Sequence, residues 1–318
     1  MAPRTSETDV RRLGGLPKVL AAAAAMGTLG PVAALAYGEG VGPATFSALR
    51  AGIGAAILAT LVLVRHQPSV SLAGLPSRQR ATLGLAVVVN GVMNLVLFFA
   101  FGAMAVGLVM AVFYLYPVLT ALMSAALGRE RLTPIRLLAL AIACAGLALV
   151  LGSQLGPDAH ATAAGIALAG IAATCHAVYL VSIRGGFDDV PGVQATSLVL
   201  AGGLIISGTA ALVIGGPGLA GAWLASPVAW AAVLCAATLG ALPKVWVIGG
   251  VRLIGSTRAA VALLLEPVVA VVVAALVLDQ RLTVSELVGG GAILVAVVLA
   301  QRPPRWTPAS IALEGETS

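Results

Sequence analysis

The feature that most constrains this chain is a series of apolar runs, each about as long as a membrane is thick. A helix needs roughly 20 apolar residues to cross the hydrocarbon core, because each residue adds about 1.5 Å. Polar and apolar residues do not alternate within these runs, so barrel strands are excluded. The ten runs are 18–37, 43–64, 81–101, 105–127, 134–152, 162–183, 193–214, 226–249, 258–278 and 284–301. The sequence predicts an all-α polytopic membrane protein with ten transmembrane helices.

The composition leads to the same class of protein. Charged residues make up 9% of the chain, against roughly 25% in soluble domains. The net charge of +6 does not indicate nucleic-acid binding, because the basic residues lie at the ends of apolar runs. Cys144, Cys175 and Cys235 fall inside apolar runs. We interpret them as small buried hydrophobic residues, not as disulfide partners or metal ligands.

The placement of Lys and Arg predicts the orientation. With a cytoplasmic amino terminus, only Arg281 lies at an outer end, while Arg50 and Lys244 lie within spans. All the others fall at the cytoplasmic side: Arg4, Arg11, Arg12, Lys18, Arg65, Arg78, Arg80, Arg129, Arg131, Arg136, Arg184, Arg252, Arg258, Arg302 and Arg305. This positive-inside pattern predicts a multi-pass protein of the bacterial inner membrane. Both tails, 1–17 and 302–318, are then cytoplasmic.

The two halves of the chain repeat with a shift of 150 residues. The sequence Leu-Tyr-Pro-Val at 115–118 meets Leu-Glu-Pro-Val at 265–268, and Arg-Leu-Thr at 131–133 recurs at 281–283. Each half, 18–152 and 162–301, holds five predicted helices. Because five is odd, the second half enters the membrane upside down. The chain is therefore predicted to be an inverted repeat, an architecture associated with alternating access.

Two threonines after the repeated Arg-Leu pair are predicted to cap helices. Thr133 is followed by Pro134, which suits the first helical turn. Thr283 is followed three residues later by Glu286, the spacing of a capping box.

Four ionisable side chains, Arg50, His176, Lys244 and Glu266, lie within spans, where a charge costs a few kcal/mol or more. Lys244 and Glu266 are each eight residues from an arginine at the cytoplasmic end of their helices, so both lie roughly 12 Å from that end. We predict an ion pair between them, or a shared network through water. The pair is either structural, or it anchors an amino-acid-like solute or couples transport to protons.

Other side chains form a wider set of candidates. His176 and Tyr179, three apart, and Asn90 and Asn94, four apart, each share a helix face. Together with Tyr114, these residues either line a solute path or join helices.

Pro117, Pro243 and Pro267 are expected to interrupt helical hydrogen bonding, either near a gate or as ordinary membrane prolines. Arg50 is expected to extend toward the interface or to bond backbone carbonyls, in a structural or gating role.

Several motifs along the chain resemble those of a known family. The chain is similar to EamA-type transporters of the drug/metabolite transporter superfamily over about residues 18–301. The resemblance is carried by residues 26–31, Arg50, 116–118, 128–133, Gly146, 265–268 and 281–283.

The resemblance implies ten helices in an inverted five-plus-five repeat and export or exchange of small organic solutes. It also implies a central cavity among helices one to four and six to nine, with helices five and ten at the periphery. The sequence departs from the family pattern at Gln280, His176 and Lys244. The last two lie on helices expected to face the cavity.

We predict a secondary transporter, an exporter or exchanger, of a small metabolite such as an amino acid. The alternatives are a passive facilitator on the same fold and, in a different class, a membrane enzyme or scaffold. No histidine has metal-ligand spacing, and neither a phosphate-binding loop nor a nucleophile elbow occurs. No cofactor or metal is therefore expected. The expected partners are a solute and lipid, not nucleic acid, and a homodimer is kept as one assembly.

Overall fold

The computed structural model describes residues 7–64, 66, 68–104, 106–130, 132–152, 161–214, 221–278 and 283–302, and its regular structure there is entirely helical. Arg131, Gln280, Arg281 and Leu282, with residues 1–6 and 303–318 of the two tails, lie outside the described residues. The α-helices are α1 (Glu7–Gly27), α2 (Leu29–Gly38), α3 (Pro43–Val64), α4 (Ser77–Ala103), α5 (Val106–Phe113), α6 (Tyr116–Ala126), α7 (Pro134–Gly152), α8 (Ala163–Ile183), α9 (Gly192–Ile214), α10 (Pro227–Ile254), α11 (Ser256–Leu263), α12 (Leu265–Leu278) and α13 (Val284–Gln301). Two short 3-10 turns, η1 (Leu72–Gly74) and η2 (Ala222–Ala225), precede α4 and α10.

Within the described residues, nine helical stretches are long and apolar enough to cross a membrane. They coincide with the second to the tenth predicted run. The first run, 18–37, is divided between α1, which carries charged residues up to Lys18, and α2, which has 10 residues. Neither α1 nor α2 alone is both long enough and apolar enough to count as a membrane-spanning helix.

Two of the spans are interrupted at equivalent places in the repeat. The helix expected over 105–127 breaks between α5 and α6 at Tyr114 and Leu115, and the one over 258–278 breaks between α11 and α12 at Leu264. Pro117 and Pro267 lie in the first turn after each break, where proline's missing N–H leaves no helical bond unmade. By contrast, α10 continues through Pro243 without a break.

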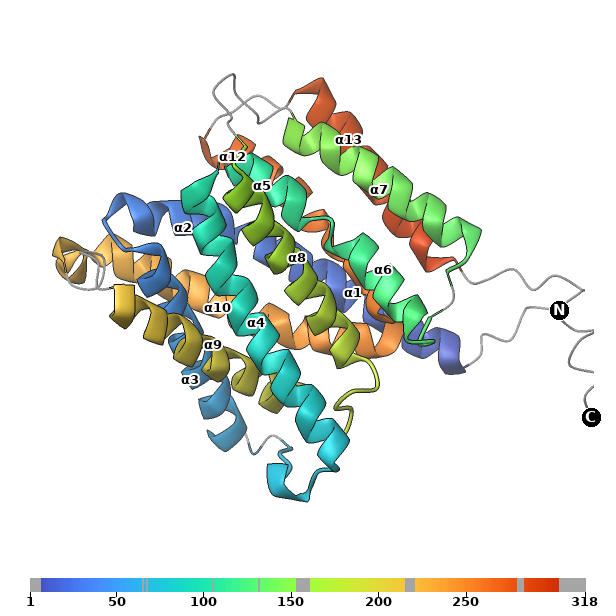
Figure 1. The fold of residues 1–318 in the computed structure, drawn as a ribbon, viewed down its shortest axis with the longest axis horizontal. Helices are drawn as coiled ribbons and strands as arrows, with labels where there is room; N and C mark the ends of the chain where they lie inside the picture. The colour runs from blue at the N-terminus through green and yellow to red at the C-terminus, as the bar shows by residue number, and fades with distance from the viewer. Residues whose placement is uncertain are drawn as a thin grey trace, which may run out of the picture.

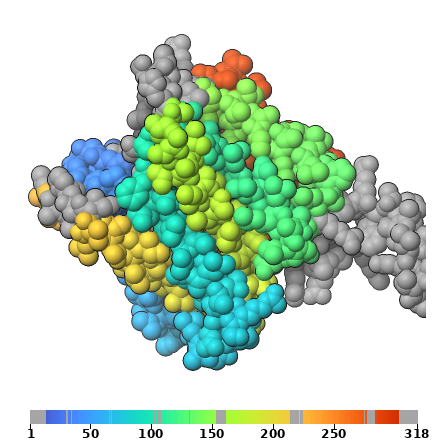
Figure 2. Space-filling model, in the orientation of Figure 1, coloured from blue at the N-terminus to red at the C-terminus, as the bar shows by residue number. Residues whose placement is uncertain are grey.

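The helices pack in antiparallel and crossing pairs that join the two halves of the chain. The most extensive pairs are α7 with α13, α3 with α9, α4 with α8, and α1 with α10. Figure 1 shows α7 and α13 side by side at one edge, and Figure 2 shows α8 lying along α4 on the front face. Gly146 and Gly289 allow the close approach of α7 and α13, because a Cβ at either would come within 2.6 Å of the other's carbonyl oxygen.

The burial pattern is that of a protein surrounded by lipid. Large apolar side chains are exposed on the outside of several helices, among them Leu63, Val64, Leu212, Val213 and Leu276. The interior is filled mainly by Ala, Val and Leu, and small residues let the helices approach closely.

The two predicted caps differ in outcome. Thr283 and Glu286 form the predicted capping box at the start of α13. Pro134 begins α7 as expected, but the Thr133 hydroxyl has no hydrogen-bond partner among the described residues. The predicted Thr133 cap is therefore not formed.

Candidate functional site

A cavity lies in the centre of the bundle, where six long helices and the break before α12 meet. Its polar lining comprises Ser47, Arg50, Asn90, Asn94, His176, Tyr179, Ser207, Lys244 and Glu266. Apolar residues including Met26, Met93, Val199, Leu200, Val247 and Leu263 complete the wall. No described residue of α5, α6, α7 or α13 lines it. The fourth predicted helix, which the resemblance places at the cavity, thus contributes none of the described lining.

The two asparagines of α4 hold the two cations of the cavity. Asn90 and Asn94 are one helical turn apart, and the Asn94 Nδ2 donates to the Asn90 carbonyl at 2.7 Å. Arg50 Nη2 donates to Asn94 Oδ1 at 2.8 Å, and Lys244 Nζ donates to Asn90 Oδ1 at 2.9 Å. Arg50 therefore bonds a side-chain amide rather than the backbone carbonyls that we expected. One face of α4 links α3 to α10.

Lys244 and Glu266 both line the cavity and interact electrostatically, but they do not touch. No ion pair within 4.0 Å joins these two described residues. The direct pair of the sequence prediction is therefore not formed, because equal depth does not make two side chains neighbours. A network through water remains a prediction.

His176 and Tyr179 lie on the cavity face of α8. The His176 ring stands edge-on to the Tyr116 ring at 4.4 Å, and its Nδ1 is 3.0 Å from Met93 Sδ. Lys244 Nζ lies 5.5 Å from the centroid of the Tyr179 ring, a distance at which a cation is attracted to the ring face. The Tyr179 ring thus forms one side of the Lys244 environment.

The remaining candidates lie outside the cavity lining. Tyr114 is buried at the α5–α6 break, with its ring 5.6 Å from that of Phe113. Pro117 and Pro267 are buried beside the breaks, and Pro243 is buried one residue before Lys244.

Sequence reasoning missed the small residues that shape the cavity. Ser47 and Ser207 share a hydrogen bond of 3.2 Å between α3 and α9. A Cβ on Gly240 would lie 3.2 Å from Arg50 Nη1, so this glycine leaves room for the guanidinium. These residues are common in membrane helices, and only their contacts distinguish them.

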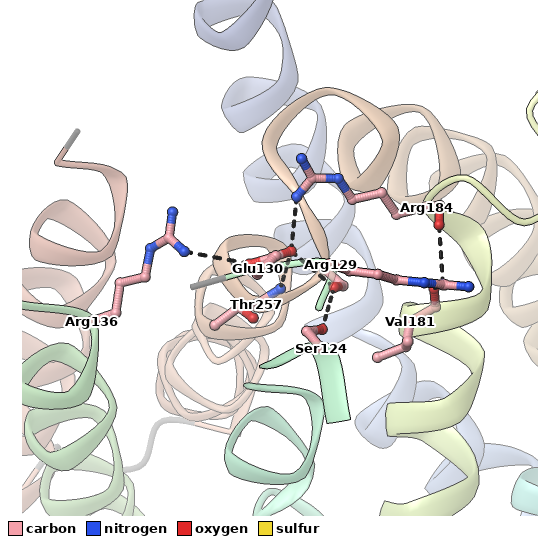
Figure 3. A network of polar contacts seen from close by, with 8 residues as sticks. Ser124, Arg129, Glu130, Arg136, Val181, Arg184 and Thr257 are labelled. Carbon is pink, nitrogen blue, oxygen red and sulfur yellow. Dashed lines mark hydrogen bonds and ion pairs between the residues drawn. The ribbon is translucent and has the colours of Figure 1, made fainter. Parts of the chain in front are cut away.

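A second polar cluster, also missed, surrounds Glu130 in the loop between α6 and α7 (Figure 3). The Glu130 side chain is 3% exposed. Its Oε1 accepts from Arg184 Nη1 at 3.0 Å and from Ser256 Oγ at 3.0 Å, and its Oε2 lies 3.7 Å from Arg136 Nη1. The Thr257 backbone N–H donates to the same carboxylate.

The Glu130 cluster connects three distant segments of the chain. Arg129 donates to the carbonyls of Val181 and Arg184 at the end of α8, and Ser124 bonds Ser256 at 2.8 Å. Beneath the cluster, all eight residues of α11 are buried. The charged Gly-Arg-Glu-Arg sequence at 128–131 could have indicated a polar cluster, but sequence spacing does not identify the distant residues that bond to it.

The described residues hold no group of three His, Cys, Asp or Glu side chains placed to bind a metal ion. Cys144, Cys175 and Cys235 are free thiols; the first two are partly buried and Cys235 is exposed, so the interpretation of all three as buried residues is wrong for Cys235.

Comparison with known proteins gives one family and one fold. The model of the EamA-like transporter family matches residues 13–152 and again 163–301. A solved structure, titled only as the crystal structure of a protein, is 22% identical. That match has a TM-score of 0.73 and covers 92% of this chain and 97% of the other. Among curated proteins, none matches the sequence.

Proposed function

Because the chain belongs to the EamA-like transporter family, and is thus a multi-pass membrane transporter of the drug/metabolite superfamily, we propose what it carries and how. It is a secondary transporter, an exporter or exchanger, of a small organic metabolite such as an amino acid. The observation that carries this proposal is the central cavity, whose charged side chains sit among apolar walls. Costly polar groups in a membrane interior are typical of a solute path.

The architecture that we propose is an inverted repeat of two five-helix halves. α1 and α2 together form the first of ten spans. The principal helix pairs support the symmetry: exchanging the halves converts the α4–α8 pair into α10–α1 and leaves α3–α9 and α7–α13 unchanged. The breaks at Tyr114–Leu115 and Leu264, 150 residues apart, support it as well.

We further propose that the solute gains access alternately from the two sides. The Glu130 cluster lies at helix ends that the positive-inside pattern assigns to the cytoplasm. With the buried α11, it forms a closed barrier between that side and the cavity. Both termini are cytoplasmic in this arrangement.

Counterflow in proteoliposomes tests the transport function. Vesicles holding the purified chain and an unlabelled amino acid are offered the same labelled compound, over a panel of amino acids. A carrier gives transient, saturable accumulation of label that requires the internal solute. Uptake that never saturates would instead indicate a passive facilitator, and no uptake across the panel would favour a non-transport role. Sensitivity to a protonophore then separates proton-coupled from passive exchange.

A further inference from the structure

We propose that the transported solute is a small organic anion, whose carboxylate binds between Arg50 and Lys244. This inference rests on the proposed transport function and adds the charge of the solute to it. Three observations about the cavity carry it.

The first observation is that the two cations of the cavity lack a carboxylate partner. Arg50 and Lys244 each bond a neutral amide oxygen, and no carboxylate of the described residues lies within 4.0 Å of either. Elsewhere in the described chain, Arg136 and Arg184 pair with Glu130, and Arg252 pairs with Asp188. A cation held away from water without an opposite charge is costly, so a bound anion would supply what these two lack.

The second observation is the charge balance of the lining. Arg50 and Lys244 face a single carboxylate, Glu266, among the lining residues. With these three groups ionised, the cavity carries one net positive charge. Lys244 lies within electrostatic range of both Arg50 and Glu266. A zwitterion would leave this surplus unchanged, whereas a net anion neutralises it.

The third observation concerns the hydrogen-bonding groups that remain unused. Arg50, Asn90 and Tyr179 line the cavity, and each carries one buried atom (Arg50 Nε, Asn90 Nδ2 and Tyr179 Oη) without a hydrogen-bond partner in the described structure. All three can donate, while the two amide oxygens are already occupied by the cations. An ionised carboxylate is an acceptor only, and its two oxygens accept several hydrogen bonds. These unused donors therefore match the two acceptor oxygens of a carboxylate.

The apolar part of the lining limits the rest of the solute. Val199, Leu200, Val247 and Leu263 form the aliphatic part of the cavity lining. A short hydrocarbon body attached to the carboxylate would contact them, whereas inorganic phosphate would not.

Counterflow with matched probes tests the inference. Glutamate, glutamine, succinate, succinamide, lysine, putrescine and inorganic phosphate are each loaded unlabelled and offered labelled. We expect exchange of glutamate or succinate at least tenfold faster than of the matched amide, and none of lysine or putrescine. Exchange of lysine or putrescine alone, of phosphate alone, or equal exchange of acid and amide overturns the inference while leaving transport intact. No exchange of any probe contradicts transport itself, and with it the inference.

The variants Arg50→Gln and Lys244→Gln test the site. Each should reduce the preference for glutamate over glutamine at least tenfold, while Arg302→Gln, exposed after α13, should leave it unchanged. The preference is a ratio within one sample, so it does not depend on the yield of folded protein. An unchanged preference in both cavity variants contradicts the site. Should a variant not fold, thermal stabilisation of the wild type by glutamate and not by glutamine is expected, and equal stabilisation contradicts the inference.

Discussion

Lys244 is the residue whose replacement bears most directly on the cavity. Its ammonium group is held between Asn90 and the Tyr179 ring. Lys244→Met keeps most of the side-chain length but removes the charge. We expect exchange in proteoliposomes to be abolished while expression and melting temperature stay near those of the wild type. Exchange at the wild-type rate in this variant would show that Lys244 does not take part in transport.

Gly240 offers a test of how precisely the Arg50 guanidinium is placed. The valine of Gly240→Val would enter space within 3.2 Å of Arg50 Nη1 and displace it from Asn94. We expect exchange to fall at least tenfold, measured as initial counterflow rate. The matched control is Gly84→Val in α4, where a Cβ meets nothing within 4 Å. Equal rates in the two variants would contradict the importance of this contact.

At the residue scale, the sequence identified which side chains are chemically unusual but not which of them touch. Hydropathy picks out Lys244 and Glu266 because each interrupts an apolar run, and helical rise gives their depth. The direction in which each points around its helix depends on neighbouring helices. That is why Asn90, 154 residues away, is the partner of Lys244 in place of the expected Glu266.

Among the elements, α7 and α13 form a peripheral pair whose packing can be tested apart from the cavity. Gly289→Leu would force these helices apart, because the Cβ alone meets the Gly146 carbonyl at 2.5 Å. Overpacking of this kind typically costs about 1–3 kcal/mol. We expect a lower melting temperature in detergent, with solute affinity of the folded fraction unchanged. Gly291→Leu on the same helix, which faces open space, should melt like the wild type.

A loss of solute affinity in Gly289→Leu, beyond the fraction that unfolds, would contradict the peripheral role of this pair.

The helices themselves were largely predictable from hydropathy, because the bilayer fixes their length. Their breaks were less so. Pro117 and Pro267 sit just after a break, whereas Pro243 lies inside the continuous α10. Proline lacks an N–H in every case, but only Pro243 lies where a helical hydrogen bond is lost, and packing against neighbours keeps α10 continuous there. Likewise, Thr283 caps its helix with the help of Glu286, and Thr133 has no such partner.

For the molecule as a whole, the Glu130 cluster joins both halves on the proposed cytoplasmic side. Glu130→Gln keeps the size of the side chain but removes the charge that Arg184 and Arg136 share. We expect the free energy of unfolding to fall by about 1–3 kcal/mol. Asp188→Asn is the control, since the Asp188 side chain is 55% exposed and pairs with Arg252 at 3.6 Å. Such an exposed pair contributes about 0–1 kcal/mol.

An equal effect of Glu130→Gln and Asp188→Asn would contradict a closing role for the cluster.

Sequence reasoning did not find this cluster because its members come from segments up to 133 residues apart (Ser124 and Thr257). The repeat predicted that the two halves are related, but the contacts that close one side depend on their final arrangement.

Access to the cavity from the two sides tests the proposed transport mechanism most directly. Met26→Cys lines the cavity and is introduced into a chain whose Cys144, Cys175 and Cys235 are replaced by Ala. A membrane-impermeant maleimide is applied to right-side-out and inside-out vesicles. Alternating access predicts labelling from both faces, with Glu130→Gln increasing the cytoplasmic share. Labelling from one face only, unchanged by Glu130→Gln, would contradict it.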